Sequence, residues 1–301
     1  MRMGTVVFGS DRSLEALGEQ LAGIEAAGFD TVWMPQIFGW DTLTALAVAG
    51  RSTSRIELGT AVVPTYPRHP TMLAAQALTT NAAVDGRLAL GIGLSHKLVI
   101  EDLMGLSFDK PAVHMRDYLS ILQPLLRERS VAYTGTTMRT QLGLELPADR
   151  AAAPPVLVAA MADHMLGLAG SLADGTILWM TGPSTVEQHI VPLISKAAAD
   201  AGRPAPRVVV GLPIRLTSDP DAARAEANEL FVIYGQLPSY RAMLDREGAA
   251  NPGDIAVVGD EAALTAALRR VESAGATDFE AAPFGTPEEV ERTLAFLAGR
   301  P

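Results

Sequence analysis

The chain has 301 residues, 48% of them hydrophobic and 19% charged, with a formal net charge of -10 and no cysteine. This composition supports a large buried core and excludes disulfides, thiolate chemistry and cysteine-ligated zinc. The acidic balance, without any block of lysine or arginine, argues against nucleic acid as a partner. No cleavable signal pattern and no apolar stretch of membrane-spanning length are found, so we expect no membrane partner and a cytoplasmic location.

The first part of the chain predicts short buried strands that alternate with helices. Ser13 is a typical N-cap, apolar residues follow it at helical spacing, and Gly28 is placed to end that helix. Further helices are predicted from about 42 to 50 and from Pro70, a residue favoured at the first helical position, to about 84. The strands between them are predicted at 5–8, 30–34, 56–60 and 87–92.

The second part repeats this alternation after an interruption. A helix is predicted at 112–126, and the polar, turn-rich stretch that follows it to Pro154 fits a small hairpin. A helix at 165–172 and a long helical excursion at 220–250 come next, and Thr286 opens the last helix with a capping box. The strands are predicted at 156–160, 176–180, 208–212 and 278–282.

Eight short apolar strands separated by helices indicate a parallel sheet. An open Rossmann sheet is the alternative, but it needs Gly-x-Gly-x-x-Gly after a strand, and Gly91 and Gly93 are followed by no third glycine. The sequence therefore predicts an α/β fold, a (β/α)8 TIM barrel, as a single domain over residues 1–301. The helical and loop insertions are expected as excursions near 127–154 and 220–255.

In a barrel of this kind the active site lies at the C-terminal ends of the strands. This rule selects, in chain order, Gln36, Ile37, residues 60–63, Ser95, His96, residues 161–165 and residues 179–182. No metal site is expected.

His96 is the candidate catalytic residue. It follows Gly91 and Gly93, whose missing side chains let a ligand approach the backbone closely. Histidine has an unperturbed pKa near neutral, which suits proton transfer beside a redox cofactor. The alternative, which stays open, is that His96 only orders its own loop.

The turn at residues 161–165 joins a predicted strand to a helix N-terminus over a short distance. Such a turn points backbone N–H groups into the barrel mouth and can bind phosphate. Asp163 leaves a second interpretation open, because a carboxylate there would cap the helix and repel an anion.

Several other residues have a structural reading as well as a functional one. His69 precedes a proline and is interpreted as a helix cap, and Trp33 lies inside a strand and is interpreted as core. Trp40 follows the second strand as a candidate wall of the pocket, with ordinary packing as an equal alternative. Ile37 and Trp179 are expected in the substrate pocket because each follows or ends a strand.

Five short motifs occur in a familiar order, at residues 27–33, 55–60, 68–70, 86–93 and 168–175. Together they resemble the luciferase-like monooxygenase superfamily, and within it the coenzyme F420-dependent branch of actinobacterial type. The resemblance covers nearly the whole chain, although no single motif is decisive.

The resemblance implies a barrel with insertions in which the cofactor lies across the strand C-termini. It implies a hydride passed between C5 of a deazaflavin and a small organic substrate stacked on its face. In many relatives the bond matching Thr60–Ala61 is a non-proline cis peptide. The family's cofactor contacts correspond here to Gln36, Thr60, Ala61, Val63, His96 and the backbone of Ala160, Met161, Ala162, Asp163, His164 and Met165.

The chain also departs from the family pattern. Sugar-phosphate dehydrogenases of the branch show Ser-Asp-His-Phe after the second strand, where this chain has Ile37 in place of the histidine. They show an acidic residue at the position of His96, and relatives often show Gly-Pro-Arg where this chain has residues 161–164. A sugar-phosphate substrate is therefore not expected, and binding of the cofactor tail is expected to be altered.

Three alternatives remain open. An FMN-dependent monooxygenase has the same fold with oxygen chemistry, and the identity of the cofactor decides between the two reaction classes. A protein that binds the cofactor but has lost catalysis is suggested by Ile37. An unrelated barrel enzyme would bind phosphate near residues 283–286. The preferred reading is an F420-dependent oxidoreductase that acts on a small molecule and forms a homodimer.

Overall fold

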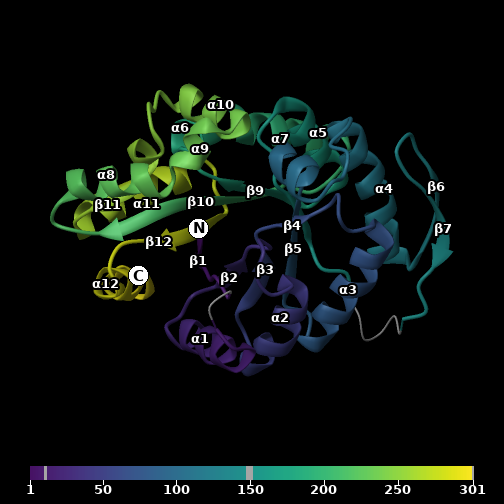
Figure 1. Ribbon diagram of the computed structural model, residues 1–301, viewed down its shortest axis with the longest axis horizontal. Coiled ribbons are helices and arrows are strands. Elements are labelled where there is room, and N and C mark those ends of the chain that lie inside the picture. Colours follow the sequence, from purple (N-terminus) through teal and green to yellow (C-terminus); the bar gives the residue numbers. More distant parts are fainter. Residues whose placement is uncertain (10–11, 147–151, 300–301) are drawn as a thin grey trace.

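The centre of the molecule is a closed barrel of eight parallel strands, in a computed structural model that describes residues 1–9, 12–146 and 152–299 (Figure 1). Its strands are β1 (Arg2–Val6), β2 (Thr31–Met34), β3 (Glu57–Thr60), β5 (Leu88–Gly93), β8 (Val156–Val158), β9 (Gly175–Trp179), β10 (Arg207–Leu216) and β12 (Asp278–Pro283). They pair in this order, and the pairing of β12 with β1 closes the ring. The predicted TIM barrel is confirmed.

Helices surround the barrel, as Figure 1 shows. Several begin as the sequence predicts, since the Ser13 hydroxyl caps α1 and Thr286 forms a capping box with Glu289 in α12. The longer helices are α1 (Leu14–Ala26), α2 (Thr42–Ala49), α3 (Pro70–Ala83), α4 (Pro111–Glu128), α5 (Asp163–Leu172), α7 (Val191–Asp200), α8 (Pro220–Leu230), α10 (Pro238–Glu247), α11 (Glu261–Ser273) and α12 (Pro287–Ala298). The short ones are α6 (Pro183–Thr185), α9 (Val232–Gln236), η1 (Gly50–Ser52), η2 (Leu98–Leu103), η3 (Val186–Ile190) and η4 (Pro252–Ile255).

The inside of the barrel is filled by apolar side chains from alternate positions of the strands. Gly59 of β3 pairs in register with Trp33 of β2, and a Cβ on Gly59 would lie 2.1 Å from the Trp33 ring. Glycine therefore makes room for the largest side chain of this cluster, and Trp33 is core as predicted. The cluster consists of Trp33, Ala89, Leu157, Ile177 and Val209.

The N-terminal end of the barrel is closed by ion pairs. The Arg207 guanidinium contacts Glu57 at 2.6 Å and Asp278 at 2.6 Å, which links β10 to β3 and β12. Its Cζ lies 5.4 Å from the centroid of the Trp33 ring. The two carboxylates raise the pKa of Arg207 against the effect of its burial, so the arginine stays charged.

Further segments extend from the barrel. β4 (Val63–Pro64) pairs with β5, β11 (Val257–Gly259) pairs with β10, and β6 (Ser130–Thr134) with β7 (Arg139–Gly143) forms an antiparallel hairpin beside α4. The expected hairpin after α4 is thus present. Residues 147–151 of that excursion lie outside the described residues. The expected helical excursion consists of α8, α9 and α10.

Some elements differ from the sequence prediction. The first strand is β1 (Arg2–Val6) instead of residues 5–8, because Arg2 pairs in register with Asp278 and contributes to the ion pairs at the N-terminal end. The sequence did not predict β11 or α11. His69 caps α3 as expected, since its Nδ1 accepts a hydrogen bond from Thr71 N.

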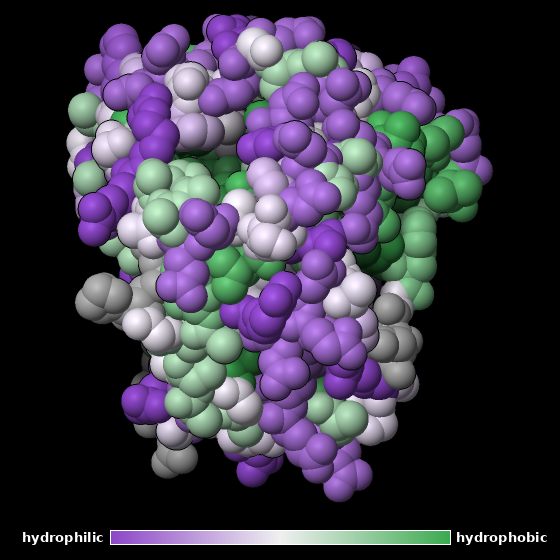
Figure 2. Space-filling model, turned by 90° about the vertical axis from the view of Figure 1, so that its left-hand side faces the viewer, coloured by the Kyte–Doolittle hydropathy of each residue, from purple (hydrophilic) through white to green (hydrophobic). Residues whose placement is uncertain are grey.

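The outer surface is mainly polar on the face shown in Figure 2, where apolar side chains lie in separate areas between hydrophilic ones. Among the described residues no helix is both long and apolar enough to cross a membrane.

Candidate active site

A cavity of about 490 Å³ opens at the C-terminal end of the barrel. Its lining comes from the ends of β1, β2, β9 and β12, from the connection between β3 and β4, from the segment after β5, and from α9 and α10. The volume lies in the range of small-molecule and cofactor sites. The cavity is therefore the candidate active site, at the end of the barrel where the fold places one.

The floor of the cavity is built from small apolar residues. Ala61, Val62, Ala159 and Ile177 line it, and they pack on the cluster inside the barrel. The peptide bond between Ala61 and Val62 is cis. The cis bond thus lies one residue after Thr60–Ala61, the bond matched from the family, because the chain leaves β3 regularly up to the Ala61 nitrogen, which donates to Met34 O at 2.9 Å.

Two glycines of β5 allow this floor to form. A Cβ on Gly91 would lie 1.9 Å from Thr60 O, and a Cβ on Gly93 would lie 2.7 Å from Val62 Cγ2. Any larger residue at either position would push the connection between β3 and β4 away. The glycines therefore serve the packing of Val62 rather than a direct approach of ligand to the β5 backbone.

The residues predicted after the third strand divide between the cavity and the core. Ala61 lines the cavity, whereas Thr60 and Val63 are fully buried and absent from its lining. The Thr60 hydroxyl donates to Gly91 O at 2.7 Å and accepts from Gly91 N at 2.8 Å. Thr60 thus holds β3 on β5, a supporting position one layer below the floor.

The segment after β2 forms one side of the cavity. Gln36 and Ile37 both line it, and Ile37 is 55% exposed, so an apolar surface faces the opening. The amide of Gln36 is already used, since its Oε1 accepts from Thr42 N at 2.7 Å. Trp40 is outside the lining, because its Nε1 donates to Arg12 O at 2.9 Å and turns the indole toward that loop.

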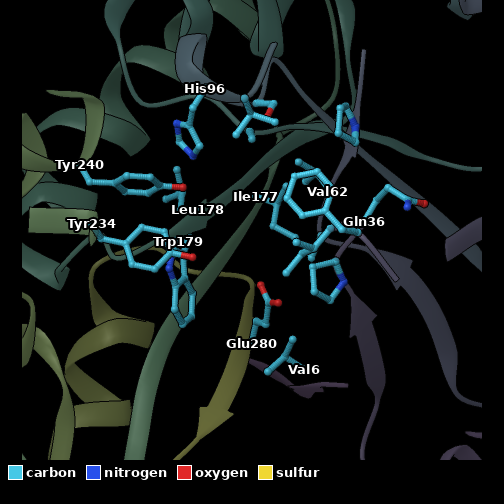
Figure 3. A pocket seen from close by; sticks show the side chains of 18 of the residues that line it. Val6, Gln36, Val62, His96, Ile177, Leu178, Trp179, Tyr234, Tyr240 and Glu280 are labelled. Carbon is cyan, nitrogen blue, oxygen red and sulfur yellow. The ribbon is translucent and has the colours of Figure 1, made fainter. Parts of the chain in front are cut away.

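His96 lies at the cavity, and Figure 3 shows its ring pointing into it. The ring is half-buried, and its centroid lies 5.7 Å from that of Tyr240. Burial lowers the pKa of His96, so the neutral imidazole predominates at pH 7. A neutral imidazole can accept a proton from a ligand or hydrogen-bond to it.

The turn between β8 and α5 only partly reaches the cavity. Met161 lines it, Ala160 is buried, and Ala162, Asp163 and His164 are exposed. Met165 is half-buried and packs on the core.

The cap of α5 settles the role of Asp163 within the turn. The N-cap residue is Ala162, without a side-chain cap bond, and Asp163 is the first helical residue, so it does not cap the helix. Asp163 is exposed, so its carboxylate lies at the solvent-exposed N-terminus of α5.

One cation lines the cavity among the described residues, and it is compensated. Arg68 contacts Asp41 at 2.6 Å and donates to Gln76 Oε1 at 2.9 Å. Hydrogen bonds from Thr44 and the ion pair with Arg68 lower the pKa of Asp41 despite its burial, so the carboxylate of the pair stays charged. The cavity therefore offers a ligand little uncompensated positive charge.

The side of the cavity formed by α9 and α10 carries two tyrosines that were not predicted from the sequence. They lie beside Trp179, which was predicted to line the pocket. Tyr234 of α9 and Tyr240 of α10 line the cavity, and the Trp179 ring lies 5.9 Å from that of Tyr234. The two tyrosines come from the helical excursion, and only its fold back over the barrel brings them here (Figure 3). Burial raises the pKa of Tyr240 and of Tyr234, so both hydroxyls stay protonated.

Glu280 of β12 also lines the cavity and was not selected from the sequence. It is 4% exposed, and burial raises its pKa to about 8. The two acidic residues of the buried strand β12, Asp278 and Glu280, were the signal that could have identified it.

The turn at residues 283–286, proposed for phosphate binding in an unrelated barrel, is occupied by protein groups. Thr286 N donates to the Glu289 carboxylate at 2.9 Å, and Glu289 pairs with Arg215. A phosphate there would meet a carboxylate at the helix N-terminus, so this turn does not favour the phosphorylated-metabolite alternative.

Comparison with known proteins adds to this geometry. A family model described as luciferase-like monooxygenase matches residues 1–298. A Mycobacterium tuberculosis protein named "Putative coenzyme F420-dependent oxidoreductase" is 35% identical over 169 residues, which cover 52% of this chain and 49% of that protein. The 5,10-methylenetetrahydromethanopterin reductase of Methanolobus tindarius is 29% identical over 226 residues, covering 74% of this chain and 68% of the reductase. The matched part of this chain thus spans about half the length of the first relative and about two thirds of the second.

A solved structure shares the fold over nearly its full length. The coenzyme F420-dependent tetrahydromethanopterin reductase of Methanopyrus kandleri superimposes with a TM-score of 0.83 at 20% identity, covering 99% of this chain and 97% of the reductase. At this identity the likeness concerns the fold alone.

Proposed function

The chain belongs to the luciferase-like monooxygenase family, and from that premise we propose that it is an oxidoreductase that passes a hydride between coenzyme F420 and a small organic substrate. The observation that carries the proposal is the apolar floor at the C-terminal end of the barrel, formed by the connection between β3 and β4. The name of the similar Mycobacterium tuberculosis protein, a putative coenzyme F420-dependent oxidoreductase, supports this cofactor.

The floor fits a flat tricyclic ring. Ala61, Val62 and Ala159 present small apolar side chains that a planar ring can lie on without steric conflict. The Cβ-sized spaces at Gly91 and Gly93 are filled by the neighbouring connection, so the floor is held in place from below.

A bound deazaflavin supplies hydride transfer at C5 and reacts poorly with oxygen, which is the chemistry that separates it from FMN. The protein would position the cofactor and exclude water from it. Ala61, Gln36 and Met161 line the cavity in which the ring and its substituents would contact the protein. His96, neutral near pH 7, is the group we propose to exchange a proton with the substrate, directly or through water.

Cofactor identity is tested by titrating the purified protein with coenzyme F420 and, separately, with FMN, followed by calorimetry and absorbance. We expect F420 to bind more tightly than FMN, because the similar mycobacterial protein is named for coenzyme F420, whereas the apolar floor by itself accepts either ring. Tight FMN binding without detectable F420 binding would overturn the proposal in favour of a flavin monooxygenase.

A further inference from the structure

The carboxylic side chain of Glu280, on β12, points into the barrel cavity from the barrel interior. Glu280 is the one Asp or Glu in the cavity lining among the described residues, and Figure 3 shows its carboxyl directed into the space. It pairs in register with Gly4 of β1 on one side and Gly211 of β10 on the other. Register-paired residues of adjacent strands point to the same face, so a glycine stands on each side of the carboxyl.

Gly211 leaves room for the carboxyl, whereas Gly4 leaves room for Thr31 and Trp33. A Cβ on Gly211 would lie 2.9 Å from Glu280 Oε2 and 3.0 Å from Trp179 Cε3. The carboxyl and the indole of Trp179 thus meet over Gly211. The glutamate is built into the wall, with its polar end at the surface of the cavity.

The Glu280 carboxyl has no ion pair or hydrogen bond among the described residues, and burial alone determines its protonation. Arg207, at the N-terminal end of the barrel, is engaged by Glu57 and by both oxygens of Asp278. With a pKa raised to about 8, Glu280 is an uncharged acid with a free O–H donor at neutral pH.

The histidine and the two tyrosines that line the cavity are uncharged as well, and the one arginine is paired. Burial lowers the pKa of His96 and raises that of Tyr234 and of Tyr240. Arg68 is compensated by Asp41. A charged ligand group would find no counter-charge here, whereas an uncharged acceptor would meet donors that lack a partner.

We propose that Glu280, as an uncharged carboxylic acid, donates a hydrogen bond to an acceptor oxygen of the substrate and thereby selects uncharged carbonyl compounds, ketones or aldehydes, and the alcohols they interconvert with. A donor in a dry cavity stabilises negative charge that develops on this oxygen when a hydride reaches the carbonyl carbon. The inference rests on the proposed function for the reaction, but the contact with the carbonyl is testable without it.

The contact is tested by infrared spectroscopy of bound acetophenone carrying a ¹³C-labelled carbonyl, with and without coenzyme F420. We expect the carbonyl stretch to fall to lower frequency on binding to the native chain. Glu280→Gln, which keeps an N–H donor, is expected to retain part of the shift, and Glu280→Leu to lose it. Glu229→Gln on exposed α8 is the matched control and is expected to behave as the native chain.

Benzylamine is the competing probe, because a cation would convert Glu280 to its carboxylate and release a proton. An unshifted acetophenone band in the native chain, or benzylamine binding with release of a proton that Glu280→Gln abolishes, would overturn the proposal. If F420 fails to bind while the Glu280-dependent band shift persists, the proposed function is wrong and the contact stands.

Turnover gives the second readout. For a carbonyl substrate we expect Glu280→Leu to lower kcat/KM by about 10²- to 10³-fold, and Glu280→Gln to retain most of it. In the native chain kcat/KM should fall as the pH rises through about 8, where Glu280 ionises, and Glu280→Gln should lack this fall. Tyr234 and Tyr240, the titratable groups that face Glu280 from α9 and α10, stay protonated there, and Arg207 and Asp278 below remain paired. A fall that persists in Glu280→Gln would count against the assignment.

Discussion

Burial decides the protonation of the polar side chains at the cavity. His96 and Glu280 would carry opposite charges if each were ionised, yet desolvation is the main cause that shifts the pKa of each toward its neutral form. The consequence reaches the stability of the fold. A carboxyl whose folded pKa is raised binds a proton more tightly in the folded state, so its contribution is full below the unfolded pKa and is lost as the pH rises toward 8.

We therefore predict that Glu280→Gln flattens the pH dependence of stability. Between about pH 5 and pH 8 the native chain should lose up to about 1.4 kcal/mol of unfolding free energy per pH unit from this group. The variant should lack that loss, which urea unfolding at several pH values measures. Equal slopes in the two proteins would mean that Glu280 is ionised in the folded state throughout this range.

His96→Gln tests the residue selected from the sequence. We expect the variant to bind coenzyme F420 as the native chain does and to slow the chemical step by about 10²- to 10⁴-fold, because glutamine cannot exchange a proton. In alcohol oxidation the activity of the native chain should decrease as the pH is lowered, because the imidazole of His96 becomes protonated. Single-turnover kinetics separate this result from the alternative, in which binding weakens and the rate constant is preserved.

The sequence could locate His96, Gln36 and Ile37 because strand ends mark the active end of a barrel. It could not locate Glu280 as an inward-facing group. A parallel strand is buried on both faces, so its residues show no polar alternation that would reveal which side chains point inward. The two acids Asp278 and Glu280 stand two residues apart, which was the available signal that they share one face.

Among the elements, the connection between β3 and β4 depends on its neighbour β5. We predict that Gly91→Ala destabilises the fold by about 1–3 kcal/mol, because the new methyl group would overlap Thr60 O and displace the floor at Ala61 and Val62. Cofactor affinity should fall with it. Thermal unfolding and the F420 titration measure the two effects.

Gly23→Ala is the matched control for this glycine. Gly23 lies in α1 with open space where a Cβ would be, so the change should raise stability by about 0.5–1 kcal/mol and leave binding unaltered. If Gly91→Ala bound the cofactor normally, the floor would not depend on β5.

The hairpin of β6 and β7 is fastened to α4 by one buried carboxylate. Asp117 accepts hydrogen bonds from the Tyr133 hydroxyl at 2.8 Å and from Thr137 N at 2.7 Å. These bonds hold its pKa well below the usual range despite burial, so the anchor is complete above about pH 4 and weakens as the pH falls below that.

We expect Asp117→Asn to cost about 1–3 kcal/mol, because its amide cannot accept all of these bonds, and to speed hydrogen exchange selectively in residues 130–143. Asp102→Asn, at an exposed position, should change neither. Unchanged exchange in the hairpin would show that its own pairing suffices.

The hydrophobic pattern and the turn residues predicted the order and type of the barrel elements. They did not predict how the inserted segments pack. The first strand was displaced because Arg2 looks like a surface residue until its pairing with Asp278 is known. The short strand β11 and the return of α9 and α10 over the cavity depend on contacts between segments far apart in the sequence, which local propensity does not report.

At the scale of the whole molecule, the net charge of -10 opposes a polyanionic ligand. We predict that the association rate of coenzyme F420, with its acidic tail, rises with ionic strength between about 0.01 and 0.15 M, because salt screens this repulsion. Stopped-flow fluorescence measures it, and riboflavin, which lacks the charged tail, should show little dependence. A rate that falls with salt would reveal a positive local field at the opening.

The ion pairs of Arg207 with Glu57 and Asp278 close the N-terminal end of the barrel, so ligands can enter the cavity only from the C-terminal end. Of two ligands, the one that binds deeper in the cavity must therefore bind first and dissociate last. Steady-state kinetics should then show ordered binding and release of the two ligands. An excess of the ligand that binds second should slow the dissociation of the ligand that binds first.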